Sequence, residues 1–217
     1  MSITRNISGK CPKCSGDLNI KIWDSVNAVY HPEEKEKIMK SELFKVECDS
    51  CGSEIALEYP CRYQDTDNHI MIYLIPDFSE DQVNELNDDL ENISMPKMME
   101  ENKFRVVGNC DELIEKILIF GCDKRDRPIE LCKKKVLKDL KIKDSNISPV
   151  AILYNHNSEG EYFSFIGCKD ENGEVLKVPF DKELYKSLDI ELVNRDAYKE
   201  GLYMVVDGSW ASTLMKQ

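Results

Sequence analysis

The chain has 217 residues, with 29 basic and 41 acidic side chains and therefore a net charge of −12. Hydrophobic residues make up 41% of it and the mean hydropathy is −0.46, which is typical of a globular protein and excludes a disordered or membrane-spanning chain. A pI near 4.8 argues against nucleic-acid binding that is driven by overall charge.

The N-terminal residues 1–6 contain no apolar stretch of the kind found in a secretory signal. We therefore expect a cytoplasmic location, where thiols stay reduced and disulfides are rare. The nine cysteines are also an odd number, so complete pairing within one chain is excluded.

The first 76 residues are predicted to form a small sheet around two cysteine pairs. A short helix is expected over 31–39, because Pro32 suits a first helical position and acidic residues follow it. Alternating or continuous apolar residues favour strands over 18–23, 43–47, 54–58 and 69–75.

Helices dominate the prediction for the middle of the chain. Ser79 and Gln82 form a capping box for a helix over 79–93, whose apolar face consists of Val83, Leu86, Leu90 and Ile93. After a strand over 103–107, Asn109 caps a second helix that ends at Gly121. A third helix over 126–140 places Ile129, Cys132, Val136 and Leu140 on one stripe.

Charge is distributed unevenly over this helical part. Residues 77–101 contain nine acids and one lysine, whereas residues 124–143 contain nine basic and three acidic residues. Two solvated faces that complement each other, within the chain or across a dimer, are the simplest interpretation. The alternatives are an acidic surface that recruits a partner, and a basic face for nucleic acid formed by Lys133, Lys134, Lys135, Lys138, Lys141 and Lys143.

The polar segment 144–149 is predicted to separate two domains. Beyond it we expect strands over 150–154, 162–168, 174–180 and 202–206, a hairpin turn at Asn172-Gly173, and a helix over 181–188. The fold class is therefore α+β: a ribbon-like β module (about 8–76), a helical part (77–143) and a β-rich C-terminal region (147–217), with 1–143 forming one domain.

Four cysteines carry the clearest chemical signal. Cys11 and Cys14 form one C-x-x-C motif, Cys48 and Cys51 form another, and a small residue follows each pair. Two such turns supply four thiolates that close a tetrahedral zinc shell, which leaves no position for water and therefore predicts a structural metal. A redox pair, an iron or iron–sulfur centre, and no metal at all are the alternatives.

These motifs resemble the bacterial CpXC proteins. The similarity runs from Cys11-Pro12-Lys13-Cys14 through residues 23–38 and 48–52 to residues 105–117, and covers roughly residues 9–137. It implies a zinc-ribbon-like module joined to an α/β part, with no assigned activity. The second pair has Asp49 where the family name expects proline, which metal binding does not require. Gln64 stands where related sequences often carry a histidine.

The remaining cysteines and histidines form no recognisable catalytic motif. Cys61, Cys110, Cys122, Cys132 and Cys168 are interpreted as small buried residues, with Cys61 the candidate for an exposed, reactive thiol. We therefore expect a zinc-containing module that binds a protein partner or a second copy of itself, without catalysis or membrane contact. Nucleic-acid binding through the ribbon and residues 124–143 is the first alternative, and an enzyme site in the C-terminal half is the second.

Overall fold

The computed structural model describes residues 2–92, 101–195 and 200–216. These residues form ten strands and six helices, and the chain divides into two compact units. Unit 1 is Met1–Ile114 with Glu200–Met204, and unit 2 is Glu115–Lys199 with Val205–Gln217. The α+β class is confirmed. The division between units lies inside helix α4 (Cys110–Gly121), and the domain boundary at 144–149 stays a prediction.

Unit 1 is organised around a five-stranded sheet with the order β1-β2-β5-β6-β7. The strands are β1 (Ile3–Lys10), β2 (Asp17–Asn27), β5 (Cys61–Asp65), β6 (Ile70–Leu74) and β7 (Lys103–Val107). β2 pairs with β5, and β6 with β7, in parallel, whereas β1–β2 and β5–β6 are antiparallel. Along β5 and β6, buried and half-buried residues alternate, so one face of these strands packs into the core.

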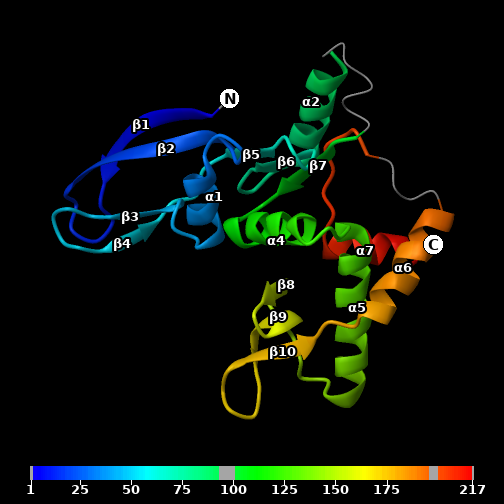
Figure 1. The fold of residues 1–217 in the computed structure, drawn as a ribbon. Coiled ribbons are helices and arrows are strands. Elements are labelled where there is room, and N and C mark those ends of the chain that lie inside the picture. The colour runs from blue at the N-terminus through cyan, green and yellow to red at the C-terminus, as the bar shows by residue number, and fades with distance from the viewer. Residues whose placement is uncertain (1, 93–100, 196–199, 217) are drawn as a thin grey trace. The chain divides into compact units, whose positions relative to one another are not determined.

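The N-terminal part of unit 1 contains two hairpins and a short helix. β1 and β2 form a long hairpin, and β3 (Lys45–Glu47) and β4 (Glu54–Ala56) form a second, separate one. Helix α1 (Pro32–Met39) lies between them in sequence and buries Ile38. The long spacer between the two cysteine pairs therefore holds structure of its own, as the sequence predicted (Figure 1).

Helix α2 (Glu80–Glu91) begins as predicted. The Ser79 hydroxyl accepts a hydrogen bond from the Gln82 amide at 3.3 Å, and the Gln82 side chain accepts one from the Ser79 amide at 2.9 Å. On its predicted apolar face Leu90 is buried and Val83 and Leu86 are half-buried, while Ile93 lies outside the described residues. The acidic side chains of α2 are exposed, which agrees with a solvated face.

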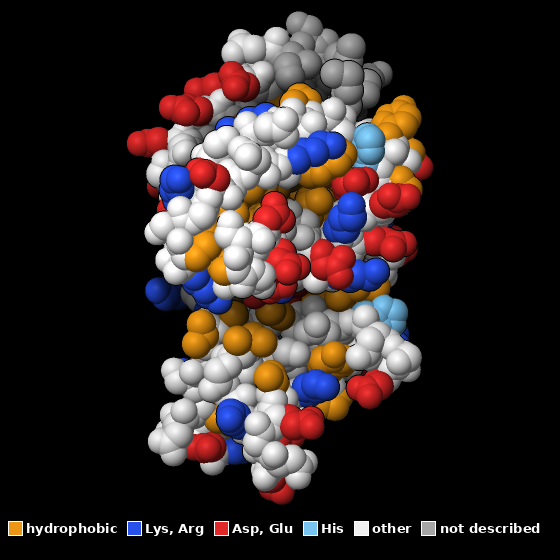
Figure 2. Space-filling view, turned by 90° about the vertical axis from the view of Figure 1, so that its left-hand side faces the viewer, with side chains coloured by type: hydrophobic (Ala, Val, Ile, Leu, Met, Phe, Trp, Pro, Cys, Tyr) orange, Lys and Arg blue, Asp and Glu red, His pale blue; other side chains and the backbone are white. Residues whose placement is uncertain are grey.

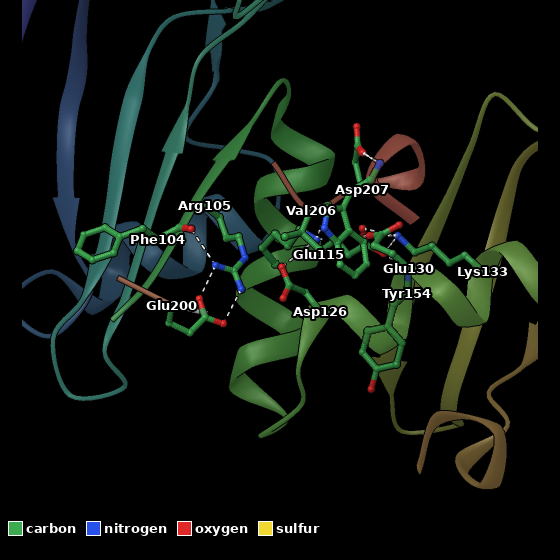
Figure 3. A network of polar contacts seen from close by, with 12 residues as sticks. Phe104, Arg105, Glu115, Asp126, Glu130, Lys133, Tyr154, Glu200, Val206 and Asp207 are labelled. Carbon is green, nitrogen blue, oxygen red and sulfur yellow. Dashed lines mark hydrogen bonds and ion pairs between the residues drawn. The ribbon is translucent and has the colours of Figure 1, made fainter. Parts of the chain in front are cut away.

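The strand predicted over 202–206 is wrong. Within unit 1 this segment makes only a single parallel bridge, between Met204 and Arg105 of β7. Arg105 is 1% exposed and donates two hydrogen bonds to the Glu200 carboxylate, at 2.9 and 3.0 Å, and one to the carbonyl of Phe104 (Figure 3). Two backbone hydrogen bonds, from the Val106 amide to the Met204 carbonyl and from the Gly201 amide to the Asn102 carbonyl, also hold the segment Glu200–Met204.

Unit 2 combines a three-stranded antiparallel sheet with helices. The sheet has the order β10-β9-β8, formed by β8 (Ala151–Asn157), β9 (Gly160–Lys169) and β10 (Val175–Pro179). The predicted turn containing Gly173, which has a φ of 81°, joins β9 to β10. Helix α5 (Asp126–Lys143) contacts α6 (Lys182–Asn194) and α7 (Gly208–Leu214), and the carboxylates of Asp181 and Asp207 cap the last two helices.

A network of buried charges occupies the centre of unit 2 (Figure 3). The Lys133 ammonium lies 2.7 Å from Glu115 and 2.9 Å from Glu130, and the Lys116 ammonium lies 3.3 Å from Asp126. Burial raises the pKa of the Glu115 carboxyl, although the Lys133 ammonium opposes this shift. The predicted basic face must therefore be corrected, because Lys133 is buried and paired and does not face solvent.

The surface mixes both signs of charge. Figure 2 shows acidic and basic side chains interspersed over the face drawn, with hydrophobic side chains between them. In the part of the chain that the structure describes, no helix combines the length and apolar character that crossing a bilayer requires.

Candidate metal centre

The four predicted ligands occupy the turns of the two N-terminal hairpins. Cys11 directly follows β1 and Cys14 precedes β2, so the first pair forms the connection of the β1–β2 hairpin. Cys48 directly follows β3 and Cys51 precedes β4, so the second pair has the same position in the β3–β4 hairpin. The alternation predicted the strands on both sides of the second pair and the strand after the first, and the hairpins place two thiols at each tip.

The two turns have the same backbone hydrogen bonds. In the first turn the amide of Cys11 donates to the carbonyl of Gly16 at 2.9 Å, and in the second the amide of Cys48 donates to the carbonyl of Ser53, also at 2.9 Å. Ser15 and Gly52 occupy equivalent positions, and both have a positive φ, 59° and 67°. The small residue that follows each pair in the sequence therefore suits a left-handed backbone conformation, which larger side chains rarely adopt.

The turns bring all four sulfur atoms together. The four ligand atoms lie within 4.8 Å of one another, with Cys11 Sγ 3.8 Å from Cys51 Sγ and Cys14 Sγ 3.7 Å from Cys48 Sγ. Both close pairs join one hairpin to the other. Sulfur atoms at the corners of a tetrahedron with metal–sulfur bonds of about 2.3 Å are about 3.8 Å apart. The four thiols are therefore spaced so that they can hold one metal ion.

Backbone amides and burial shape the electrostatics of this cluster. The amides of Lys13 and Gly16 each point at a sulfur of the first pair, at 3.4 Å. Cys11 and Cys48 are buried and Cys14 and Cys51 are exposed, so one side of the cluster is open to solvent. Hydrogen bonds from the side chain and amide of Ser53 lower the pKa of Cys51 to about 6. A thiolate is the form that binds metal.

The two hairpins approach most closely at Gly16 and Ser50. A Cβ atom at Gly16 would lie 2.7 Å from Ser50 Oγ, which is closer than real Cβ contacts, and 3.0 Å from Ser50 Cβ, which is tighter than most of them. The same atom would lie 3.3 Å from Cys14 Sγ. Gly16 is therefore required for the approach of one cysteine turn to the other, and its place beside Cys14 is a detail that the C-x-x-C pattern alone does not reveal.

Unit 1 also contains a cavity of about 520 Å³ on the opposite face of the sheet from the core. Side chains from the half-buried positions of β5 and β6, Arg62, Gln64, Met71 and Tyr73, line it together with residues of α2 such as Leu86 and Asp89. Arg62 Nε is buried and has no hydrogen-bond partner among the described residues. Gln64 also lines this cavity.

The five single cysteines divide into two groups. Cys61 and Cys132 are buried as predicted, and burial raises the pKa of each thiol to about 12, so the suggestion that Cys61 is exposed and reactive is wrong. Cys110, Cys122 and Cys168 are only partly buried, which corrects the expectation for these three. Cys122 also contacts His156, a contact that sequence reasoning missed because the two residues are 34 positions apart.

Two hairpins that present paired cysteines at their tips define a class of ribbon-like, four-cysteine proteins. The family model described as "CpXC protein" matches residues 10–133, which is more than half of the chain and includes all four clustered cysteines. The chain therefore belongs to the CpXC family. No curated protein and no solved structure shows a significant match to it.

Proposed function

We propose that this protein is a non-enzymatic binding or assembly module whose N-terminal hairpins are held together by one structural zinc ion. The observation that carries the proposal is the spacing of the four sulfur atoms across the two hairpins. Cys11, Cys14, Cys48 and Cys51 would hold the ion, and zinc would supply a closed, redox-inert link between the hairpin tips. With four thiolates bound, no position is left for a substrate or a water molecule.

A tetrahedron of four thiolates suits zinc or iron, and we propose zinc because two C-x-x-C turns are the ligand pattern of structural zinc ribbons. Zinc sites of four cysteines are structural sites, and their binding free energy contributes directly to folding. The hairpin β3–β4 has only three residues in each strand and its strand residues are half-buried or exposed. A hairpin this small gains little from burial, so a metal link accounts for its order.

Metal analysis of the purified protein tests this proposal. We expect about one zinc per chain after purification under reducing conditions. The Cys14→Ser variant should lose the metal because it removes one of four ligands, whereas Cys168→Ser, a change at a partly buried cysteine outside the cluster, should retain it. Bound iron, no metal, or full zinc occupancy in Cys14→Ser would each contradict a four-thiolate zinc site.

The binding role is supported by the cavity in unit 1. Its volume of about 520 Å³ falls in the range of about 300–1,000 Å³ that ligand pockets occupy. Apolar side chains, including Met71, Leu86 and Phe104, line it beside charged groups at Arg62 and Asp89. This mixture fits an extended protein segment, which supplies apolar side chains and backbone polar groups together. A protein partner is therefore the occupant that we propose.

Selection of displayed peptides on the zinc-loaded protein tests this role. We expect enrichment of peptides whose affinity falls about tenfold or more in Asp89→Lys, because this residue lines the cavity. Asp88→Lys makes the same charge change at the neighbouring exposed position of α2, which does not line the cavity, and should have little effect. No enrichment, or equal effects of the two variants, would argue against the cavity as the binding site.

Nucleic-acid binding through residues 124–143 receives less support from the geometry. Arg127 and Lys133 are buried, so they cannot contribute to a surface that contacts phosphates. The exposed lysines of this segment are Lys138, Lys141 and Lys143. A binding isotherm at low salt distinguishes the two roles, because affinity for nucleic acid that falls steeply with added salt would favour the alternative.

A further inference from the structure

The C-terminal end of α4 places a cysteine beside a histidine of unit 2. Cys122 Sγ lies 3.1 Å from Nδ1 of His156, which is on β8. The amide of Cys122 donates to the carbonyls of Leu118 and Ile119, at 3.0 and 3.2 Å, so the end of the helix fixes the position of the thiol. A thiol with an imidazole nitrogen at hydrogen-bond distance is the arrangement that activates a cysteine nucleophile.

Polar groups of the same sheet face surround this pair. Tyr154 is two residues from His156 on β8 and therefore lies on the same face, and its hydroxyl also approaches the Cys122 thiol. Glu161 of β9 is the direct cross-strand neighbour of His156. The Glu161 carboxylate accepts a hydrogen bond from the Tyr154 hydroxyl and lies 2.6 Å from the Lys124 ammonium.

This arrangement directs the proton of the thiol towards the histidine. Burial opposes ionisation of Glu161, but hydrogen bonds from Lys124, Tyr154 and Lys182 lower its pKa to about 2, so it is a carboxylate at neutral pH. Because the Tyr154 hydroxyl donates to this carboxylate, its proton does not compete for Nδ1 of His156. In the tautomer that leaves Nδ1 unprotonated, this nitrogen is a base at hydrogen-bond distance from the Cys122 thiol.

Cys122 differs from the other cysteines, all of which lie in the described part of the chain. Cys61 and Cys132 are buried, and the four cysteines of the cluster are the proposed zinc ligands. Cys110 and Cys168 are partly buried like Cys122, but no histidine contact is found for either of them among the described residues. Cys122 is therefore a thiol that is partly exposed to solvent and that also has a neighbouring base.

We propose that Cys122 is a site of reversible modification by low-molecular-weight disulfides, with His156 acting as the base. The Cys122 proton passes to Nδ1 of His156, and the thiolate attacks one sulfur atom of the disulfide. A new sulfur–sulfur bond forms as the old one breaks, and the expelled thiolate takes the proton from the imidazolium. Cys122 is oxidised to a mixed disulfide, and the other half of the reagent is reduced to a thiol.

Disulfide exchange is the reaction class that this site fits. It requires an accessible thiolate, a proton acceptor and a reagent that supplies its own leaving group. Acyl transfer would require, in addition, hydrogen-bond donors that stabilise a tetrahedral oxyanion. Among the described residues, the side chains that contact Cys122 are the imidazole of His156 and the phenol of Tyr154, and the phenol already donates to Glu161.

The test is site-resolved reaction of the zinc-loaded, full-length protein with glutathione disulfide at pH 7, followed by peptide mass spectrometry. Cys168 in the same molecule provides the internal reference, because it is partly buried in the same unit. We expect Cys122 to react at least about tenfold faster than Cys168, and His156→Gln to remove most of this difference without changing the rate at Cys168.

A second variant controls for general effects of removing a histidine. His31→Gln changes a residue of unit 1 that packs against Trp23, and it should leave the Cys122 rate unchanged. The wild-type comparison is decisive even if His156→Gln folds poorly. Equal or slower reaction of Cys122 relative to Cys168 in the wild-type protein would overturn the proposal, as would a Cys122 rate that His156→Gln, folded, does not lower.

Discussion

At the scale of single residues, Gly16 and Ser50 determine how closely the two cysteine turns can approach. Gly16→Ala would place a methyl group 2.7 Å from Ser50 Oγ and 3.0 Å from Ser50 Cβ, so the Ser50 side chain must turn and the two hairpins must separate slightly. Overpacking of this kind costs about 1–3 kcal/mol, and we expect zinc affinity to fall about tenfold. Competition with a chromophoric chelator measures the affinity.

Two further variants separate this clash from a general effect of replacing glycine. Ser50→Gly removes the two closest atoms that the new methyl group meets and leaves only Cys14 Sγ at 3.3 Å, so the double variant should regain most of the lost affinity. Gly9→Ala adds a methyl group on β1 that would meet nothing within 4 Å and should be neutral. If Gly16→Ala binds zinc as tightly as the wild-type protein, the hairpins do not depend on this contact.

Lys133 illustrates why a residue's position in a charge run does not reveal its environment. Its ammonium contacts Glu115 and Glu130, both buried, and the neighbouring charges raise its pKa although burial opposes this. Lys133→Met would leave two buried carboxylates without this partner, at a cost of about 3–5 kcal/mol. Lys138→Met, at an exposed position of the same helix, should change the stability by less than about 0.5 kcal/mol.

Urea unfolding of unit 2 measures both effects. The protein has two tryptophans, Trp23 in unit 1 and Trp210 in unit 2, so a Trp23→Phe background leaves Trp210 fluorescence as a signal from unit 2 alone. Similar midpoints for the two lysine variants would show that the buried network contributes nothing specific to the stability of unit 2.

At the scale of elements, the sequence was informative wherever a local pattern decides the structure. The capping residues of α2, the glycine turn between β9 and β10 and the strands β2, β3 and β4 beside the cysteine pairs follow from short-range rules, and the structure contains all of them. β1 and β5 were missed, because neither sequence shows a clear alternation of apolar and polar side chains. β1 is exposed along nearly its whole length, and β5 is polar at alternate positions.

Contacts between distant residues explain the remaining errors. The segment 202–206 has the composition of a strand. It forms only one bridge, between Met204 and Arg105, before Asp207 caps helix α7. The burial of Lys133 depends on Glu115, which is 18 residues away, and the contact of Cys122 with His156 spans 34 residues. The four thiols that could hold a metal ion were predictable, because the spacing within each pair is itself a local pattern.

The capping box of α2 makes a separate prediction about a single element. Ser79→Ala removes the acceptor of the Gln82 amide, and loss of such a cap costs about 1 kcal/mol. Ser79→Asp retains an acceptor and should restore most of the stability. Hydrogen exchange of the amides at the start of α2 reports on this element directly, and unchanged protection in Ser79→Ala would mean that the helix end does not depend on its cap.

At the scale of the whole molecule, the thiol cluster distinguishes the two units. Arg105 in unit 1 and Lys133 in unit 2 each form a buried ion pair, and both units contain aromatic contacts. The four clustered thiols that could hold a metal ion all lie in unit 1. Removal of the proposed zinc ion should therefore act on one unit and spare the other.

Treatment with a strong zinc chelator tests this separation by hydrogen exchange. We expect faster exchange in peptides covering β1–β2 and β3–β4, because loss of the ion releases both hairpin tips and its binding free energy no longer supports their folding. Peptides from β8, β9 and α5 should exchange as before, since no residue of the thiol cluster lies in unit 2.

Tryptophan fluorescence provides a second measurement of the same separation, because removal of zinc should change the signal of Trp23 in unit 1 and leave that of Trp210 in unit 2 unchanged. Uniform loss of protection would show that the metal stabilises both units as one cooperative structure, and unchanged protection of the hairpins would show that they fold without it.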